Sequence, residues 1–117
     1  MDKSYIKNNV RIKVEDRIIF QDYEVFNITV SNNTMKTVLL DSQNETDNIY
    51  IQDADDNKYY WLNNEYFEEE LTFHEGEQRT IPIKFSRSYD PSANVLKIEF
   101  SKIIIDNKNA ISIEIYI

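Results

Sequence analysis

The sequence predicts an all-β domain, an antiparallel sandwich of eight or nine strands. Two observations predict it: apolar and polar residues alternate along several runs, and turn-forming residues separate these runs. The 117 residues suit a single domain, and its core has to form without disulfides because the chain contains no cysteine.

The alternating runs predict the strands in chain order. The clearest are residues 10–15, 26–30, 80–85, 96–101 and 111–117, where apolar side chains share one face, as a half-buried strand requires. With the weaker runs included, the expected strands are 9–15, 18–20, 22–31, 36–41, 49–53, 58–62, 69–73, 79–86, 95–105 and 110–117, the second of which can merge with a neighbour. Residues 1–8 are polar, so we expect a loose segment there and a domain over residues 9–117.

Turn residues separate these strands. Gly76 is the only glycine, so Asn and Asp have to supply most of the left-handed turn positions, which they tolerate better than other residues do. Pro82 cannot donate a ladder hydrogen bond, so its strand is expected to lie at a sheet edge or to carry a bulge. Residues 63–70 are the one stretch with some helical character.

The chain is acidic, with 21 acidic and 13 basic residues and a formal net charge of −8. Such a surface repels phosphate backbones and anionic lipids, which disfavours nucleic acids and membrane surfaces as partners. No apolar run is long enough to span a membrane, and the first residues lack the apolar segment of a signal peptide. We therefore expect either a cytoplasmic protein or an exported one whose targeting segment is absent from this chain.

The acidic turn at residues 53–57 is a candidate metal site. Asp53, Asp55 and Asn57 place side-chain oxygens at the first, third and fifth positions of a loop, as at the start of an EF-hand. Lys58 and Asn64 occupy the positions where an EF-hand has glycine and glutamate, which leaves a looser Ca²⁺ site. The alternative, which the residues favour, is a plain acidic hairpin turn.

An aromatic cluster follows this turn and is a candidate ligand-binding surface. Exposed rings can stack on a sugar while neighbouring amides and carboxylates bind its hydroxyl groups, and Tyr59, Tyr60, Trp61 and Asn63 offer these groups. Alternation places Tyr59 and Trp61 on one face and Tyr60 on the other, so one set is expected to face outward. The alternative is that Trp61 packs in the core of the sandwich.

No catalytic residue is predicted. Glu68, Glu69 and Glu70 offer carboxylates, but a solvated acidic face explains them better than general acid–base catalysis does. His74 is the only histidine; it lies beside a turn and has no nucleophile motif with it. We therefore expect a protein that is not an enzyme and has no cofactor, unless Ca²⁺ binds at the acidic turn.

Two segments resemble a known group of domains, residues 23–34 and the tail formed by residues 81–85 and 98–103. The first ends in Val30-Ser31-Asn32-Asn33-Thr34, the pattern V-x-N-x-T, and the acidic turn at 53–57 precedes Lys58-Tyr59 as in those domains. Over about residues 10–105 the chain resembles immunoglobulin-like domains of unknown function in Gram-positive exported proteins and lipoproteins. The resemblance implies an immunoglobulin-like sandwich, an envelope location and a non-enzymatic role, and it supplies no functional residue.

Two functions remain open at this point. The first is a non-catalytic envelope or extracellular module, a spacer or a protein-interaction domain, whose edge strand can offer a partner a surface by β-augmentation. The second is a carbohydrate-binding module for cell-wall glycans, Ca²⁺-assisted, that uses the aromatic cluster with Asp53, Asp55 and Asn63.

Overall fold

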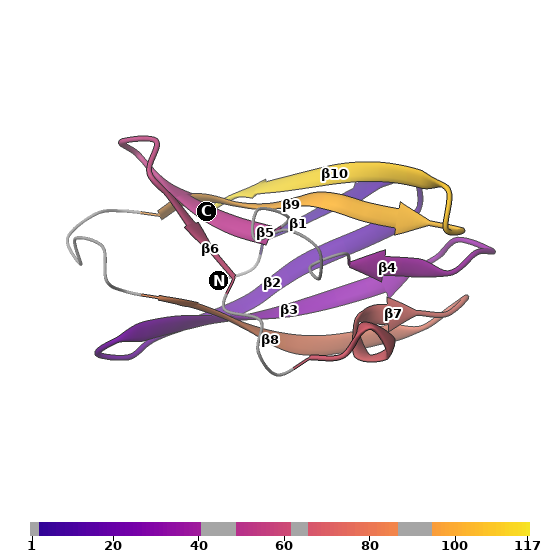
Figure 1. The fold of residues 1–117 in the computed structure, drawn as a ribbon, viewed down its shortest axis with the longest axis horizontal. Helices are drawn as coiled ribbons and strands as arrows, with labels where there is room; N and C mark the ends of the chain where they lie inside the picture. Colours follow the sequence, from indigo (N-terminus) through magenta and orange to yellow (C-terminus); the bar gives the residue numbers. More distant parts are fainter. Residues whose placement is uncertain (1–2, 41–48, 62–65, 87–94) are drawn as a thin grey trace.

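The computed structural model describes residues 3–40, 49–61, 66–86 and 95–117, and it is an all-β sandwich of two antiparallel sheets (Figure 1). Ten strands and one short 3₁₀ helix lie in these residues. They are β1 (Lys3–Lys7), β2 (Val10–Ile19), β3 (Tyr23–Asn32), β4 (Val38–Leu40), β5 (Ile49–Asp53), β6 (Lys58–Tyr60), η1 (Glu68–Leu71), β7 (Thr72–Phe73), β8 (Gln78–Ser86), β9 (Val95–Ile105) and β10 (Asn109–Tyr116).

The strands form one sheet of four and one of six. Sheet A has the order β1-β2-β3-β8, and sheet B has the path β6-β5-β9-β4-β7, with β10 paired to β9. Both β5 and β10 pair with Ile98 of β9, and both β4 and β10 pair with Ile103. Strands β4 and β5 therefore lie end to end along one edge of β9, and β10 covers the other edge.

The core lies between the two sheets and consists of the apolar positions of the alternating runs. Val10, Ile12 and Val14 of β2 are fully buried, and Phe26 of β3 packs edge-on against Phe85 of β8 with ring centroids 5.8 Å apart. In sheet B, Ile51, Ile98 and Ile115 are buried in the same way. The sequence prediction of an antiparallel sandwich with apolar inner faces is confirmed.

The turns use the residues that the sequence indicated. Positive φ angles occur at Asn8, Asn9, Asp56, Asp106 and Asn107, and Gly76 has φ +76°. Short polar side chains tolerate this conformation, so a chain with one glycine can still make tight hairpins. The strand of Pro82 lies at an edge of sheet A, and its pairing with β3 continues past Asn27 opposite Pro82 without a register shift.

Three elements differ from the sequence expectation. Residues Lys3–Lys7, expected to be loose, pair with β2 as strand β1. The run 18–20 is no separate strand, because β2 continues to Ile19 through a bulge between Val14 and Asp16. The expected strand 69–73 is a turn of 3₁₀ helix followed by the two-residue strand β7, and part of the stretch expected to have helical character, residues 63–65, lies outside the described residues.

The two lateral sides of the sandwich are joined differently. On one side, β8 meets the region of β6 and β7: Trp61 forms an isolated bridge with Phe85, the Tyr66 hydroxyl donates to the Pro82 carbonyl at 2.9 Å, and Arg79 donates to the Thr72 carbonyl at 2.8 Å. On the other side, β1 faces β10, and the Lys7 ammonium donates to the Ser112 carbonyl at 3.2 Å.

Candidate functional site

The three aromatic residues of the predicted ligand surface do not share one face. Trp61 is only 8% exposed and packs in the core beside Tyr66, with ring centroids 5.7 Å apart. Tyr59 is half-buried against the core, and its hydroxyl donates to Asp53 at 3.2 Å. Tyr60 is 38% exposed and faces outward, and Asn63 lies outside the described residues. Tyr60 is therefore the predicted aromatic residue that a ligand can reach.

The acidic turn is organised by Asp53. One oxygen of its buried carboxylate accepts the backbone N–H groups of Asp55 at 2.9 Å and Asn57 at 3.0 Å. The other accepts the Asn57 side-chain amide and the Tyr59 hydroxyl, each at 3.2 Å. Burial raises the pKa of Asp53, but these hydrogen bonds outweigh it and hold the pKa below its ordinary value.

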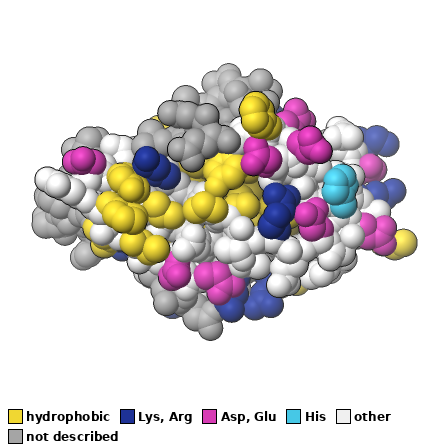
Figure 2. Space-filling model, turned by 90° about the horizontal axis from the view of Figure 1, so that it is seen from below, with side chains coloured by type: hydrophobic (Ala, Val, Ile, Leu, Met, Phe, Trp, Pro, Cys, Tyr) yellow, Lys and Arg dark blue, Asp and Glu magenta, His cyan; other side chains and the backbone are white. Residues whose placement is uncertain are grey.

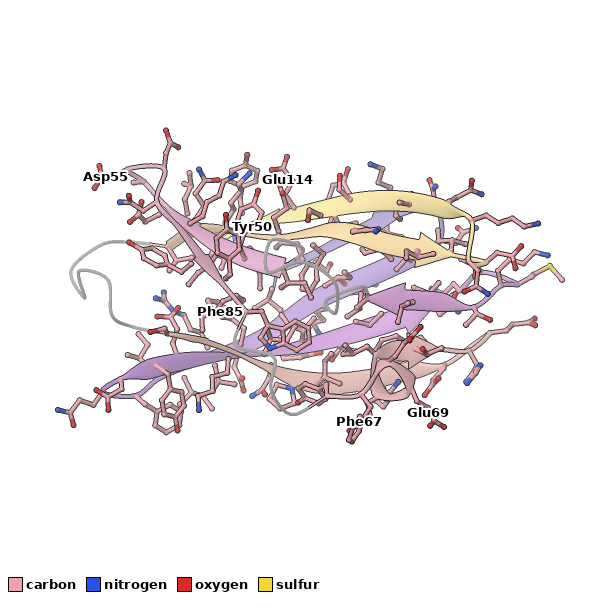
Figure 3. The ribbon with its side chains drawn as sticks, in the orientation of Figure 1. Tyr50, Asp55, Phe67, Glu69, Phe85 and Glu114 are labelled. Carbon is pink, nitrogen blue, oxygen red and sulfur yellow. The ribbon has the colours of Figure 1, made fainter. Side chains whose placement is uncertain are left out.

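Both Asp53 oxygens thus accept hydrogen bonds from donors of the hairpin itself. A cation at this turn would have to displace these donors. Asp55 is exposed at the tip of the β5–β6 hairpin, where Figure 3 shows it pointing into solvent. Within the described ranges, no three acidic or histidine side chains are grouped so that they would hold a metal ion. The Ca²⁺ site stays a prediction.

Tyr60 belongs to an ordered set of side chains on the outer face of sheet B, which we call the polar face. The strand registers place these residues in two rows that cross four strands. The rows are Tyr116–Lys97–Gln52–Lys58 and Glu114–Glu99–Tyr50–Tyr60. With strands about 4.8 Å apart, each row spans about 14 Å.

Hydrogen bonds connect the middle of the polar face. The Tyr50 hydroxyl donates to Glu99, and the Lys97 ammonium donates to Glu99 at 3.3 Å and to Glu114 at 2.5 Å. Lys58 lies over the Tyr50 ring at 4.8 Å from its centroid. In Figure 3 the labelled Tyr50 and Glu114 lie on the same side of the molecule, above the strands of sheet B.

These contacts shift the pKa values of three groups on the polar face. Burial, together with the hydrogen bond to Glu99, raises the pKa of Tyr50 to about 12. The hydrogen bond from Lys97 lowers the pKa of Glu114, and the same bond raises the pKa of Lys97. The face is therefore a preorganised arrangement of charges near neutral pH, with a tyrosine at one end of each row.

A second exposed surface lies at the β2–β3 hairpin, which projects from one end of the sandwich (Figure 1). Ile18, Ile19 and Phe20 are 43%, 55% and 43% exposed, and Phe20 stacks on Tyr23 with ring centroids 4.6 Å apart. Lys84 lies 4.1 Å from the centroid of the Tyr23 ring. We call Ile18, Ile19, Phe20 and Tyr23 together the hairpin tip. Figure 2 shows a group of hydrophobic side chains toward the left of the face seen from below, the end of the molecule where the hairpin lies in Figure 1, and a second group at the centre of that face.

The motif that carries the resemblance has a structural role in this chain. Asn32 is fully buried, and its amide donates to the Lys36 and Phe73 carbonyls at 2.7 and 2.9 Å. Its side-chain carbonyl oxygen accepts hydrogen bonds from the Thr34 backbone N–H at 2.9 Å and from the Thr34 hydroxyl at 2.7 Å. Asn32 and Thr34 thus fix the turn after β3 and connect it to β7, so the motif indicates a fold and not a ligand site.

Comparison with known proteins adds nothing to this description: no family model, no curated protein and no solved structure matches the chain. Among the residues that the structure describes, no helix has the length and apolar character that a membrane span requires.

Sequence reasoning missed the polar face and the hairpin tip for different reasons. The polar face joins residues from 50 to 116, and no local pattern reveals the register across four strands. The hairpin tip had a local signal, because the consecutive apolar residues Ile18, Ile19 and Phe20 break the alternation of β2. Successive residues of an extended chain point to opposite faces, so three consecutive apolar residues cannot all face the core.

Proposed function

We propose that this domain is a non-catalytic protein-interaction module, and that the hairpin tip is its contact surface. The observation that carries the proposal is the exposure of three consecutive large apolar side chains, Ile18, Ile19 and Phe20, on a projecting hairpin. An exposed cluster of this kind costs free energy in water, and such patches commonly mark sites where another protein binds. The resemblance to Gram-positive immunoglobulin-like domains supports an envelope location, which is part of the proposal.

The surroundings of the hairpin tip suit a protein partner. Arg17 is held by two hydrogen bonds of 3.1 Å to the buried Glu24, so the tip has a rigid base. Lys84 lies against Tyr23, and the exposed Asp22 lies in the turn, so the rim is polar. Aromatic and aliphatic anchors inside a polar rim are typical of the centre of an interface. We infer that the partner offers an apolar pocket with a polar border.

The experiment is site-specific photo-crosslinking in the cells that produce the protein. A benzophenone amino acid replaces Phe20 in one variant and Phe67 in a matched control, because Phe67 is also an exposed phenylalanine, at 76%, near η1 (Figure 3). We expect a discrete cross-linked protein band from position 20 that is absent from position 67. An added Ile19→Asp substitution should abolish the band while the melting temperature is kept. No band at position 20, or equal bands at both positions, would exclude the hairpin tip as the contact surface.

A second candidate function, carbohydrate binding, is favoured by one observation. Tyr60 faces outward at the end of a row that also offers Glu99 and Glu114, so an exposed ring shares one face with fixed hydrogen-bonding groups two and three strands away. Binding of cell-wall polysaccharide or peptidoglycan to the purified domain tests it. We expect Tyr60→Ala to lower the bound fraction about tenfold, as the loss of one stacking contact predicts, and Phe67→Ala to leave it unchanged.

Whether carbohydrate binding needs Ca²⁺ is tested separately. Since Asp53 already accepts four hydrogen bonds, we expect the same binding with added Ca²⁺ and with a chelator. Binding that a chelator removes would instead support the Ca²⁺-assisted form at Asp53, Asp55 and Asn57.

A further inference from the structure

The side of the sandwich where β1 faces β10 holds a groove of about 320 Å³. It is lined from β1 by Lys3, Tyr5 and Lys7 and from β10 by Ser112, Glu114 and Tyr116. The volume lies at the lower end of the range of small-molecule sites, about 300 to 1,000 Å³. The groove is separate from the hairpin tip, so a ligand here does not depend on the proposed protein contact. It adjoins the polar face through Glu114 and Tyr116, at the opposite end of the rows from Tyr60 and Lys58.

The residues of β1 that line the groove point inward. The register pairs Lys3 with Val14, Tyr5 with Ile12 and Lys7 with Val10, and the three β2 residues are fully buried core residues. Cross-strand partners share a face of the sheet. Lys3, Tyr5 and Lys7 therefore occupy core-facing positions of an edge strand but are polar and exposed.

This geometry excludes an extended peptide strand as the occupant. Cα atoms of β1 and β10 approach within 8 Å, whereas a strand inserted between them needs about 4.8 Å on each side. Inward-pointing lysines on an edge strand also oppose pairing with a further strand. The groove suits a compact ligand with hydrogen-bonding groups.

The side chains of the groove define the chemistry of that ligand. Tyr5 and Tyr116 are 48% and 57% exposed, so two rings are available to stack on the apolar face of a ligand. The Lys7 ammonium donates to the Ser112 carbonyl and has further protons to donate, and Lys3 forms no ion pair with a described residue. Lys97 pairs with Glu114 and also with Glu99, so it offsets only part of their negative charge. The lining itself has the two lysines against the single carboxylate of Glu114. The groove therefore carries a net positive charge on a chain whose formal net charge is −8.

We propose that this groove binds an acidic sugar unit, a monosaccharide ring that carries a carboxylate. The ring stacks on Tyr116 or Tyr5, the carboxylate accepts hydrogen bonds from Lys3 and Lys7, and the hydroxyl groups bind the serine and backbone groups of β10. A lone anion would use the lysines alone, and a neutral sugar would leave the Lys3 ammonium unused. A ligand that has both a ring and a carboxylate engages the rings and the lysines together.

The test is an NMR titration of the whole chain with three probes that separate these parts. Sodium glucuronate has the ring and the carboxylate, glucose has the ring alone, and sodium acetate has the carboxylate alone. We expect glucuronate to shift the amide signals of β1 and β10 with saturation, and to bind about tenfold more tightly than glucose or acetate, the effect of one charge-assisted hydrogen bond or one stacking contact.

Variants locate the site and have matched controls on the same molecule. Lys3→Gln and Tyr116→Leu should each weaken glucuronate binding about tenfold, whereas Lys58→Gln and Phe67→Leu, at exposed residues outside the groove, should not. All four side chains are exposed, so the dispersion of the amide spectrum should be kept; Tyr5→Leu replaces Tyr116→Leu if it is not.

Three results would overturn the proposal. They are equal affinity for glucuronate and acetate, which indicates an anion site only; no saturable shift in β1 and β10; and equal loss of affinity in Lys58→Gln and Lys3→Gln. None of these results bears on cross-linking at Phe20, so the two proposals fail separately.

Discussion

Arg17 and Glu24 form the most buried ion pair among the described residues. The guanidinium donates two hydrogen bonds to a carboxylate that is fully buried, and it lies 5.5 Å from the centroid of the Phe26 ring. Removing one partner of a buried pair costs more than the pair contributes, because a charge then stays in the interior without its counterion. The pair therefore fixes the base of the β2–β3 hairpin.

We expect Arg17→Met to lower the free energy of unfolding by about 3 kcal/mol. The double variant Arg17→Met/Glu24→Leu removes the buried charge as well and should recover to within about 1 kcal/mol of the original chain. Urea denaturation of the three proteins measures both values. If the double variant is less stable than Arg17→Met, the ion pair is not the reason for the loss.

Asn32 provides a second prediction at the residue scale. Its side chain makes four hydrogen bonds inside the fold, and leaving buried backbone groups unsatisfied costs about 1 to 3 kcal/mol. We expect Asn32→Ala to destabilise the domain by this amount, and the exposed neighbour Asn33→Ala to stay within about 0.5 kcal/mol. Thermal or urea unfolding distinguishes the two; equal effects would contradict the structural role of the V-x-N-x-T motif.

Tyr50, a residue of the polar face, makes the free energy of unfolding depend on pH in the alkaline range. Its pKa is about 12 in the folded state and near 10.0 when unfolded, so the unfolded state loses its proton first. The contribution of Tyr50 to stability is complete below pH 10 and is lost as the pH rises toward 12, by on the order of 2 kcal/mol. Titration of tyrosinate absorbance should show one late-titrating group that Tyr50→Phe removes. Its persistence in Tyr50→Phe would assign it to another tyrosine.

At the scale of elements, the hairpin tip and the core strand β2 should respond differently to substitution. Ile19 is 55% exposed, whereas Ile12 of the same strand is fully buried. We expect Ile19→Lys to change the free energy of unfolding by less than about 0.5 kcal/mol and Ile12→Ala to lower it by about 2 to 5 kcal/mol. A large loss in Ile19→Lys would mean that the tip serves folding and not binding.

Strands could be predicted from the sequence where one face of the strand is apolar and the other is polar. Strands β8, β9 and β10 begin and end within one residue of the predicted ranges, because their alternation follows from burial of one face. Strand β1 was missed because its five residues are all exposed, and only its pairing with β2 makes it a strand. Such pairing is a property of the assembled sheet and leaves no periodic pattern in an edge strand.

The candidate sites could be predicted from the sequence only in part. Alternation separated Tyr60 from Tyr59 and Trp61, but which set faces the core depends on how β6 pairs with β5 and on the bridge from Trp61 to Phe85. The acidic turn was identified correctly as a turn, with Asp53 buried at its centre. The groove between β1 and β10 required both chain ends to meet, which no local pattern indicates.

At the scale of the whole molecule, three carboxylates make the stability of the folded state depend on pH in the acidic range. The backbone N–H of His74 lowers the pKa of Glu77, and the Lys97 ammonium lowers that of Glu114. For Asp53, burial raises the pKa but the hydrogen bonds of its turn outweigh this effect. The folded state thus holds fewer protons than the unfolded state at acidic pH, and stability is present above the ordinary pKa values and lost below them.

We therefore expect the melting temperature to be constant above about pH 5 and to fall as the pH drops below the ordinary values of 3.8 and 4.5 for these groups. Calorimetry from pH 7 down to 2 measures this. Glu77→Gln should show a shallower decrease, since it removes one of the three groups. A melting temperature that does not change over this range would contradict the assigned hydrogen bonds.

Lys3 and Tyr116 line one groove, so the first and last described strands end close to each other in a sandwich whose longest dimension is 42 Å (Figure 1). Segments joined to the two ends would leave from neighbouring points. A chain that enters and leaves at neighbouring points gains almost none of the 42 Å as reach. Within a longer polypeptide, such a domain would therefore add little to the distance between the segments that flank it.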